Sequence, residues 1–251
     1  MGDLRIAGIY RYPVKSLQGE GLAAGVLTEQ GLRGDRRWGL VDVDTGRVLS
    51  AKTEPLLMQA TAYTDGEVVR IRLPEGELFA PGPEADAALS AWLGRPVRLE
   101  NAAATEGRFE MNVDNVDDAS PVIELPCPPG TFFDAAPVHL LTTASVRAMQ
   151  QREPASAWNV RRFRPTLLIE AAADGFAEDE WIGGTVRVGG AELAVFAPTV
   201  RCRMTVHEQP GIERDLGVIT AVNRDHGGNL GVYAVVRTPG RVAVGDDVTV
   251  G

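Results

Sequence analysis

Short apolar segments separated by turn signals recur along most of the chain, and they constrain its fold more than any other feature. The turn signals include Asp44-Thr45-Gly46 and Gly189-Gly190, which are typical of β-hairpins. Many short strands with few helices favour a barrel or sandwich over a doubly wound sheet. We therefore expect a mainly β fold of the α+β class, with strands at residues 4–12, 38–43, 48–51, 68–73, 138–141, 167–170, 185–188, 191–196, 230–237 and 242–250.

Three segments have helical spacing instead. The first is expected at residues 83–95, ended by Gly94, and the second at about 143–152, with Thr142 or Thr143 as its N-cap. The third is expected at 213–224, before a Gly-Gly stop. A proline-rich stretch at 121–130 then divides the chain into two β-rich halves, residues 1–120 and 121–251.

Composition excludes several classes of function. A formal charge of -9 in 251 residues argues against broad binding to nucleic acid or anionic membranes. The sequence contains no apolar run of about 18 residues and no secretory signal at its start, so we expect a cytoplasmic protein without a membrane span. Two distant cysteines, Cys127 and Cys202, are expected to be reduced.

Common catalytic motifs are also missing. The three histidines lie far apart and lack helical zinc spacing, and no dinucleotide, P-loop or Gly-x-Ser-x-Gly motif occurs. Asp114, Asp117 and Asp118 do not have the spacing of a calcium loop, so a solvated acidic turn is the better interpretation.

The segment from Pro198 to Thr205 contains the best candidate for chemistry. It holds Cys202 between Arg201 and Arg203, directly after an apolar strand-like run. A thiolate is a soft metal ligand, and neighbouring guanidinium groups favour the deprotonated form. A free cysteine considered alone is more often a structural core residue, so this interpretation needs further support. The arginines are clustered, and Lys15 and Lys52 are the two lysines among 25 basic residues. This clustering is compatible with a local pocket for an anion.

Further support comes from motifs that resemble those of the MOSC family, the C-terminal domain of molybdenum cofactor sulfurases. In its two-domain form, the chain is similar to amidoxime-reducing components and their bacterial relatives. The resemblance covers nearly the whole chain and rests on Tyr12 to Gly19, Gly31 to Trp38, Leu141 to Ser145, Phe163-Arg164-Pro165, Arg201-Cys202 and Tyr233 to Val250, which includes a Pro-Gly-x-x-x-Val-Gly-Asp motif.

The resemblance implies a MOSC-type β-barrel preceded by a smaller β-rich domain, with a bound molybdenum cofactor (Mo-molybdopterin). Cys202 would supply a thiolate to molybdenum. The implied cofactor contacts are Lys15, Ser16 and Arg36 from the first half and Thr142, Thr143, Ser145, Arg164, Thr166 and Arg201 from the second. Lysine, guanidinium, hydroxyl groups and a helix N-terminus are all suitable partners for a phosphate.

The implied activity is reduction of N-hydroxylated compounds. Electrons would come from a separate ferredoxin, flavodoxin or cytochrome, because the sequence has no cysteine-rich extension. A cofactor carrier or sulfur-delivery module without turnover is the alternative, and a structural barrel with an empty pocket is a third. Two departures from the family leave the substrate open: Thr166 stands where asparagine is common, and Val206 to Gly211 replace an Asp-Pro-Asp-Thr-Gly stretch.

Overall fold

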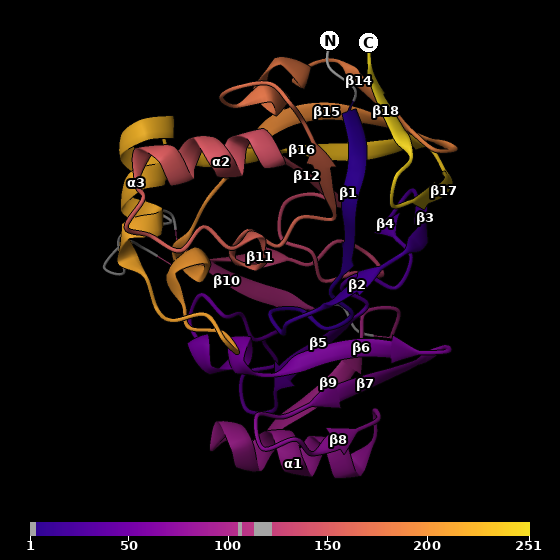
Figure 1. The fold of residues 1–251 in the computed structure, drawn as a ribbon. Helices are drawn as coiled ribbons and strands as arrows, with labels where there is room; N and C mark the ends of the chain where they lie inside the picture. The colour runs from indigo at the N-terminus through magenta and orange to yellow at the C-terminus, as the bar shows by residue number, and fades with distance from the viewer. Residues whose placement is uncertain (1–3, 105–106, 113–121) are drawn as a thin grey trace.

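A computed structural model of the chain describes residues 4–104, 107–112 and 122–251 (Figure 1). Seven of the described strands form a closed barrel in the order β13-β12-β16-β15-β14-β18-β1, and β1 pairs with β13 to complete the ring. Neighbouring strands are antiparallel except for β12 and β13. The barrel strands are β1 (Leu4–Arg11), β12 (Val138–Thr142), β13 (Leu167–Glu170), β14 (Thr185–Val188), β15 (Ala191–Val200), β16 (Asn229–Thr238) and β18 (Asp247–Val250).

Alternating apolar residues fill the barrel. In β16, Val232, Ala234 and Val236 are buried, and in β15, Leu193 and Val195 are buried against them. Successive side chains of a strand point to opposite faces, so this alternation places one set inside and the other outside. The mainly β fold expected from the sequence is confirmed, and its barrel takes β1 from the opposite end of the chain to the other six strands.

A second apolar core is formed by residues of the small sheets, of one helix and of the neighbouring loops. These elements lie at the lower end of Figure 1. The helix α1 (Pro83–Leu93) packs beside β9 and ends at Gly94, whose φ is 67°. The strands of this part are β5 (Trp38–Asp42) with β9 (Val97–Asn101), and β6 (Thr61–Asp65), β7 (Val68–Arg72) and β8 (Leu78–Phe79). The remaining short elements are β2 (Glu20–Leu22), β3 (Ala24–Thr28), β4 (Gly31–Leu32), β10 (Arg108–Asn112), β11 (Val122–Pro126), β17 (Gly240–Ala243) and the 3₁₀ turns η1 (Pro55–Gln59), η2 (Val160–Arg162), η3 (Ala177–Trp181) and η4 (Arg203–Val206).

Two further helices lie side by side against the barrel (Figure 1). The helix α2 (Thr143–Arg152) begins after Thr142, whose side chain accepts a hydrogen bond from the Ser145 amide, as expected of an N-cap. The helix α3 (Leu216–His226) begins later than residue 213, because the Asp215 side chain caps it by accepting from the Gly217 amide. Among the described helices, none has the length and apolar character needed to cross a membrane.

Some expected strands have different limits. Residues 48–51 form a single bridge, between Val48 and Val41, rather than a strand. The segment 242–250 is split into β17 and β18, because Gly245 has a φ of 93° and the Asp246 carboxylate accepts from the Ala243 amide. The proline-rich segment 121–130 contains β11. The domain boundary after residue 120 and the acidic turn at Asp114, Asp117 and Asp118 fall outside the described residues.

Candidate functional site

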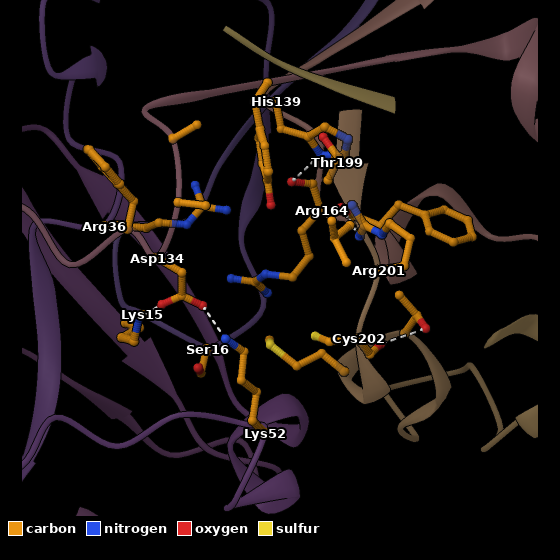
Figure 2. A pocket seen from close by; sticks show the side chains of 18 of the residues that line it. Lys15, Ser16, Arg36, Lys52, Asp134, His139, Arg164, Thr199, Arg201 and Cys202 are labelled. Carbon is orange, nitrogen blue, oxygen red and sulfur yellow. Dashed lines mark hydrogen bonds and ion pairs between the residues drawn. The ribbon is translucent and has the colours of Figure 1, made fainter. Parts of the chain in front are cut away.

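A cavity of about 330 Å³ is lined by residues from both halves of the chain (Figure 2). This volume is within the range of sites for small molecules and cofactors. The lining residues are Lys15, Ser16, Arg36, Lys52, Phe132, Phe133, Asp134, Ala135, Ala136, His139, Arg162, Phe163, Arg164, Thr166, Thr199, Val200, Arg201, Cys202, Met204, Thr205 and Tyr233.

Positive charge dominates this lining. Six of the lining residues are lysine or arginine and one, Asp134, is a carboxylate. Lys15, Arg164 and Arg201 are each at most 8% exposed. Buried charges are costly unless they are paired, so a cavity with this excess of cations is suited to a ligand with several negative charges.

Asp134 joins the two lysines. Its carboxylate accepts from the Lys15 ammonium, and its other oxygen lies 3.1 Å from Lys52 Nζ (Figure 2). Burial acts to raise the pKa of Asp134, but the two ammonium groups outweigh burial and hold this pKa well below its usual range. Burial lowers the pKa of Lys15, although Asp134 opposes that shift. The three groups therefore form a compact charged cluster at one side of the cavity.

Two buried guanidinium groups have donors left over. Arg164 Nη1 donates to Leu17 O at 2.7 Å and Arg201 Nη2 donates to Phe163 O at 2.8 Å. Arg164 Nη2 and Arg201 Nε are buried and have no hydrogen-bond partner in the described part of the chain. Burial, followed by repulsion from Arg36, lowers the pKa of Arg164 to about 10. An anion in the cavity would satisfy these donors and relieve the repulsion.

Three residues with strained backbone conformations also line the cavity. In the described residues, positive φ outside glycine occurs at Ser16 (67°), Arg36 (49°) and Arg164 (51°). All three residues line the cavity. The left-handed region is unfavourable for residues with a Cβ, and strain of this kind is found preferentially at functional sites. The strained backbone thus marks the cavity independently of its charge.

Cys202 lies where β15 ends and η4 begins. Its carbonyl oxygen accepts from the amide and hydroxyl of Thr205, which fixes the turn. Nearby, the fully buried Arg162 donates to the carbonyl oxygens of Thr205 and Glu213 and so holds the adjoining loops. Cys202 lines the cavity rather than lying in the apolar core (Figure 2).

Lys52 lies close to this thiol. Burial acts to lower the pKa of Lys52, but Asp134 and Cys202 outweigh it and raise this pKa above its ordinary value.

The structure brings together seven of the ten residues predicted to form the site. Lys15, Ser16, Arg36, Arg164, Thr166, Arg201 and Cys202 all line the cavity. Thr166 is held there because its hydroxyl oxygen accepts from the His139 amide at 3.1 Å.

The structure does not bring Thr142, Thr143 and Ser145, the other three predicted cofactor contacts, into the lining of this cavity. The hydroxyls of Thr142 and Ser145 donate to the buried Glu178 carboxylate at 2.5 and 2.6 Å. Thr143 pairs instead with the backbone of Ala171. These side chains therefore fix the start of α2 and do not line the cavity.

Sequence reasoning did not select Lys52, Asp134, His139 or Tyr233 as site residues. The rarity of lysine in this chain was a signal for Lys52, whereas Asp134 lies in an irregular segment without a recognisable motif. Burial, followed by the charge of Arg201, lowers the pKa of His139 well below its ordinary value, so its ring is neutral at neutral pH.

The cavity has few protein ligands for a free metal ion. In the parts of the chain that are described, no group of three or more His, Cys, Asp or Glu side chains is placed to hold a metal. Cys202 would be a single protein ligand, whereas protein metal sites usually need three or four.

Two family models match the two halves of the chain. A family model described as the MOSC domain matches residues 128–249, and one described as the MOSC N-terminal beta barrel domain matches residues 3–93. The molybdenum cofactor sulfurase of Drosophila grimshawi is 27% identical over 95% of this chain, which spans 34% of that protein. Mitochondrial amidoxime-reducing component 1 of Homo sapiens is 23% identical, covering 97% of this chain and 82% of that protein.

The chain thus spans about a third of the sulfurases that it matches. Among solved structures, the YUAD protein from Bacillus subtilis aligns with a TM-score of 0.49 at 12% identity, covering 99% of this chain and 95% of its own.

Proposed function

The chain belongs to the MOSC family, and from this premise we propose that it is a molybdenum cofactor-dependent oxidoreductase that reduces N-hydroxylated compounds. The observation that carries the proposal is the Cys202 thiol in a cavity lined by six cationic side chains from both halves of the chain. The name of the human relative, an amidoxime-reducing component, supports this choice of substrate class.

The residues present are suited to the cofactor. A pterin phosphate is a multiply charged anion, for which Lys15, Lys52 and Arg36 supply positive charge. The unpartnered donors of Arg164 and Arg201 would satisfy further oxygen or nitrogen acceptors of the ligand. Cys202 would be the protein ligand to molybdenum. When bound, the cofactor supplies the two-electron chemistry that cleaves the N–O bond.

The protein's own groups bind and orient the ligands. Asp134 holds the two lysines in place, and the positive φ at Ser16, Arg36 and Arg164 sets the direction in which each side chain leaves the backbone. The overall reaction consumes two electrons and two protons and releases the reduced nitrogen compound and water. The electrons would come from a separate ferredoxin, flavodoxin or cytochrome.

The test uses protein made in a host that synthesises the pterin. We expect molybdenum and pterin in the purified protein, and reduction of an amidoxime with reduced methyl viologen as the artificial donor. Cys202→Ser should abolish turnover, whereas Cys127→Ser should retain it, because Cys127 packs behind Phe132 and does not itself line the cavity. Unchanged turnover in Cys202→Ser would contradict the proposal.

The same measurements address the alternative of a cofactor carrier or sulfur-delivery module, which the sulfurase relatives favour. A protein that retains molybdenum and pterin but reduces no N-hydroxylated compound would point to the carrier. A protein that retains no pterin would indicate a structural barrel.

A further inference from the structure

An aromatic surface runs from the cavity toward the outside of the barrel. Tyr233 of β16 lines the cavity, and its ring meets His139 edge to face with centroids 6.1 Å apart. On β15, Phe196 stacks against Tyr233 at 6.3 Å and 21° and is 48% exposed. Val200, also in the lining, is 52% exposed. These side chains offer an apolar, partly flat face beside a strongly charged cavity.

Tyr233 and Cys202, the residue that we propose as the metal ligand, line the same cavity. A phenol is protonated at neutral pH and can donate a hydrogen bond, so the Tyr233 hydroxyl is suited to a ligand that carries an oxygen acceptor.

We propose, on the basis of the function proposed above, that Tyr233 and Phe196 are substrate-positioning and specificity residues. The Tyr233 hydroxyl donates to the N-hydroxyl oxygen of the substrate and orients it beside Cys202. The stacked rings of Tyr233 and Phe196 contact a planar substituent, so the protein prefers aromatic N-hydroxylated compounds to aliphatic ones.

Benzamidoxime and acetamidoxime are matched probes, because they differ only in a phenyl or methyl substituent. Binding of each to the protein is measured by calorimetry without an electron donor, and kcat and KM are measured with reduced methyl viologen. We expect wild-type protein to bind benzamidoxime at least tenfold more tightly. Phe196→Leu should raise the Kd and KM for benzamidoxime about three- to tenfold, the range for one aromatic pair, and leave those for acetamidoxime unchanged.

Tyr233→Phe should lower kcat/KM about tenfold for both probes, in line with the loss of one hydrogen bond, with unchanged molybdenum and pterin content. The control variants are Tyr63→Phe and Phe79→Leu. These residues lie in the small sheets away from the cavity, so the variants should leave kcat/KM and the Kd for both probes unchanged. Equal affinity of the wild type for the two probes, or loss of cofactor in Tyr233→Phe, would overturn the inference. Failure of the wild type to reduce either probe despite full cofactor content would instead overturn the proposed function on which it rests.

Discussion

Asp134 lies between two lysines in a cavity that otherwise contains only cationic charges, so replacing it with asparagine should have a measurable cost. Asp134→Asn keeps the shape of the side chain and removes its charge. Lys15, which is 4% exposed, then loses the carboxylate that compensates it. The Asp134 side chain is 30% exposed, so water partly screens the interaction.

Removing one partner of a fully buried ion pair costs about 3–5 kcal/mol, and partial exposure reduces this to about 2–3 kcal/mol. In a chain of this length, that loss corresponds to a decrease in Tm of roughly 5–10 °C. Because the pKa of Asp134 is depressed, the advantage of the wild type should be fully present above about pH 4 and disappear as the pH falls. Inorganic phosphate should partly restore the variant, by about 1.4 kcal/mol at ten times its Kd.

The assay is urea denaturation of cofactor-free protein at several pH values, with and without phosphate. Asp247→Asn is the matched control, since its carboxylate pairs with Arg5 but is 81% exposed and should contribute less than about 1 kcal/mol. If Asp134→Asn were as stable as Asp247→Asn at pH 7, the carboxylate would not be compensating the lysines. Stabilisation by phosphate that is equal in the wild type and the variant would likewise refute a shared anion position.

Three further outcomes follow from the structure. Arg164→Gly should have a free energy of unfolding in urea about 1 kcal/mol higher than that of Arg164→Ala. Both variants lose the guanidinium, and only glycine relieves the positive φ of 51°. Equal free energies of unfolding would argue against backbone strain at this position. Burial raises the pKa of Glu178, so the wild type loses stability as the pH rises and this carboxyl group ionises. The stability of Glu178→Gln relative to wild type should therefore increase from about pH 4 to pH 7. A difference in stability that does not change with pH would contradict this. Gly31→Ala should lower Tm far more than Gly46→Ala. Both glycines have positive φ, but the new Cβ at Gly31 would lie 2.3 Å from Pro137 O, whereas the new Cβ at Gly46 has no neighbour within 4 Å. Similar decreases in Tm would exclude the clash with Pro137.

Local sequence rules predicted most of the barrel. Strands β13 and β14 begin and end where the apolar periodicity does, and Thr142 caps α2 as expected. The errors arose where a side chain overrides the pattern, as when the Asp215 side chain delays the start of α3. Strand pattern alone did not predict that β1 would close the ring with β13, because the two segments are more than 150 residues apart.

The residues of the site likewise divide into those that the sequence predicted and those that it did not. The adjacent residues Arg201 and Cys202 could be selected from the sequence, because their chemistry depends on neighbours in the chain. The sequence did not show that Thr142 and Ser145 lie outside the cavity, because a helix start indicates which hydroxyls are near an N-terminus but not which buried group they meet. Glu178, 36 residues after Thr142, takes both of them.

The sequence by itself determined the alternation that makes strands, the turns that separate them and the thiol beside a guanidinium. Only the tertiary structure decided that Lys15 meets Asp134 across 119 residues and that the two share a cavity with Cys202. The physical reason is that backbone conformation depends on near neighbours, whereas the field within a cavity depends on every charge that folding brings within a few ångströms.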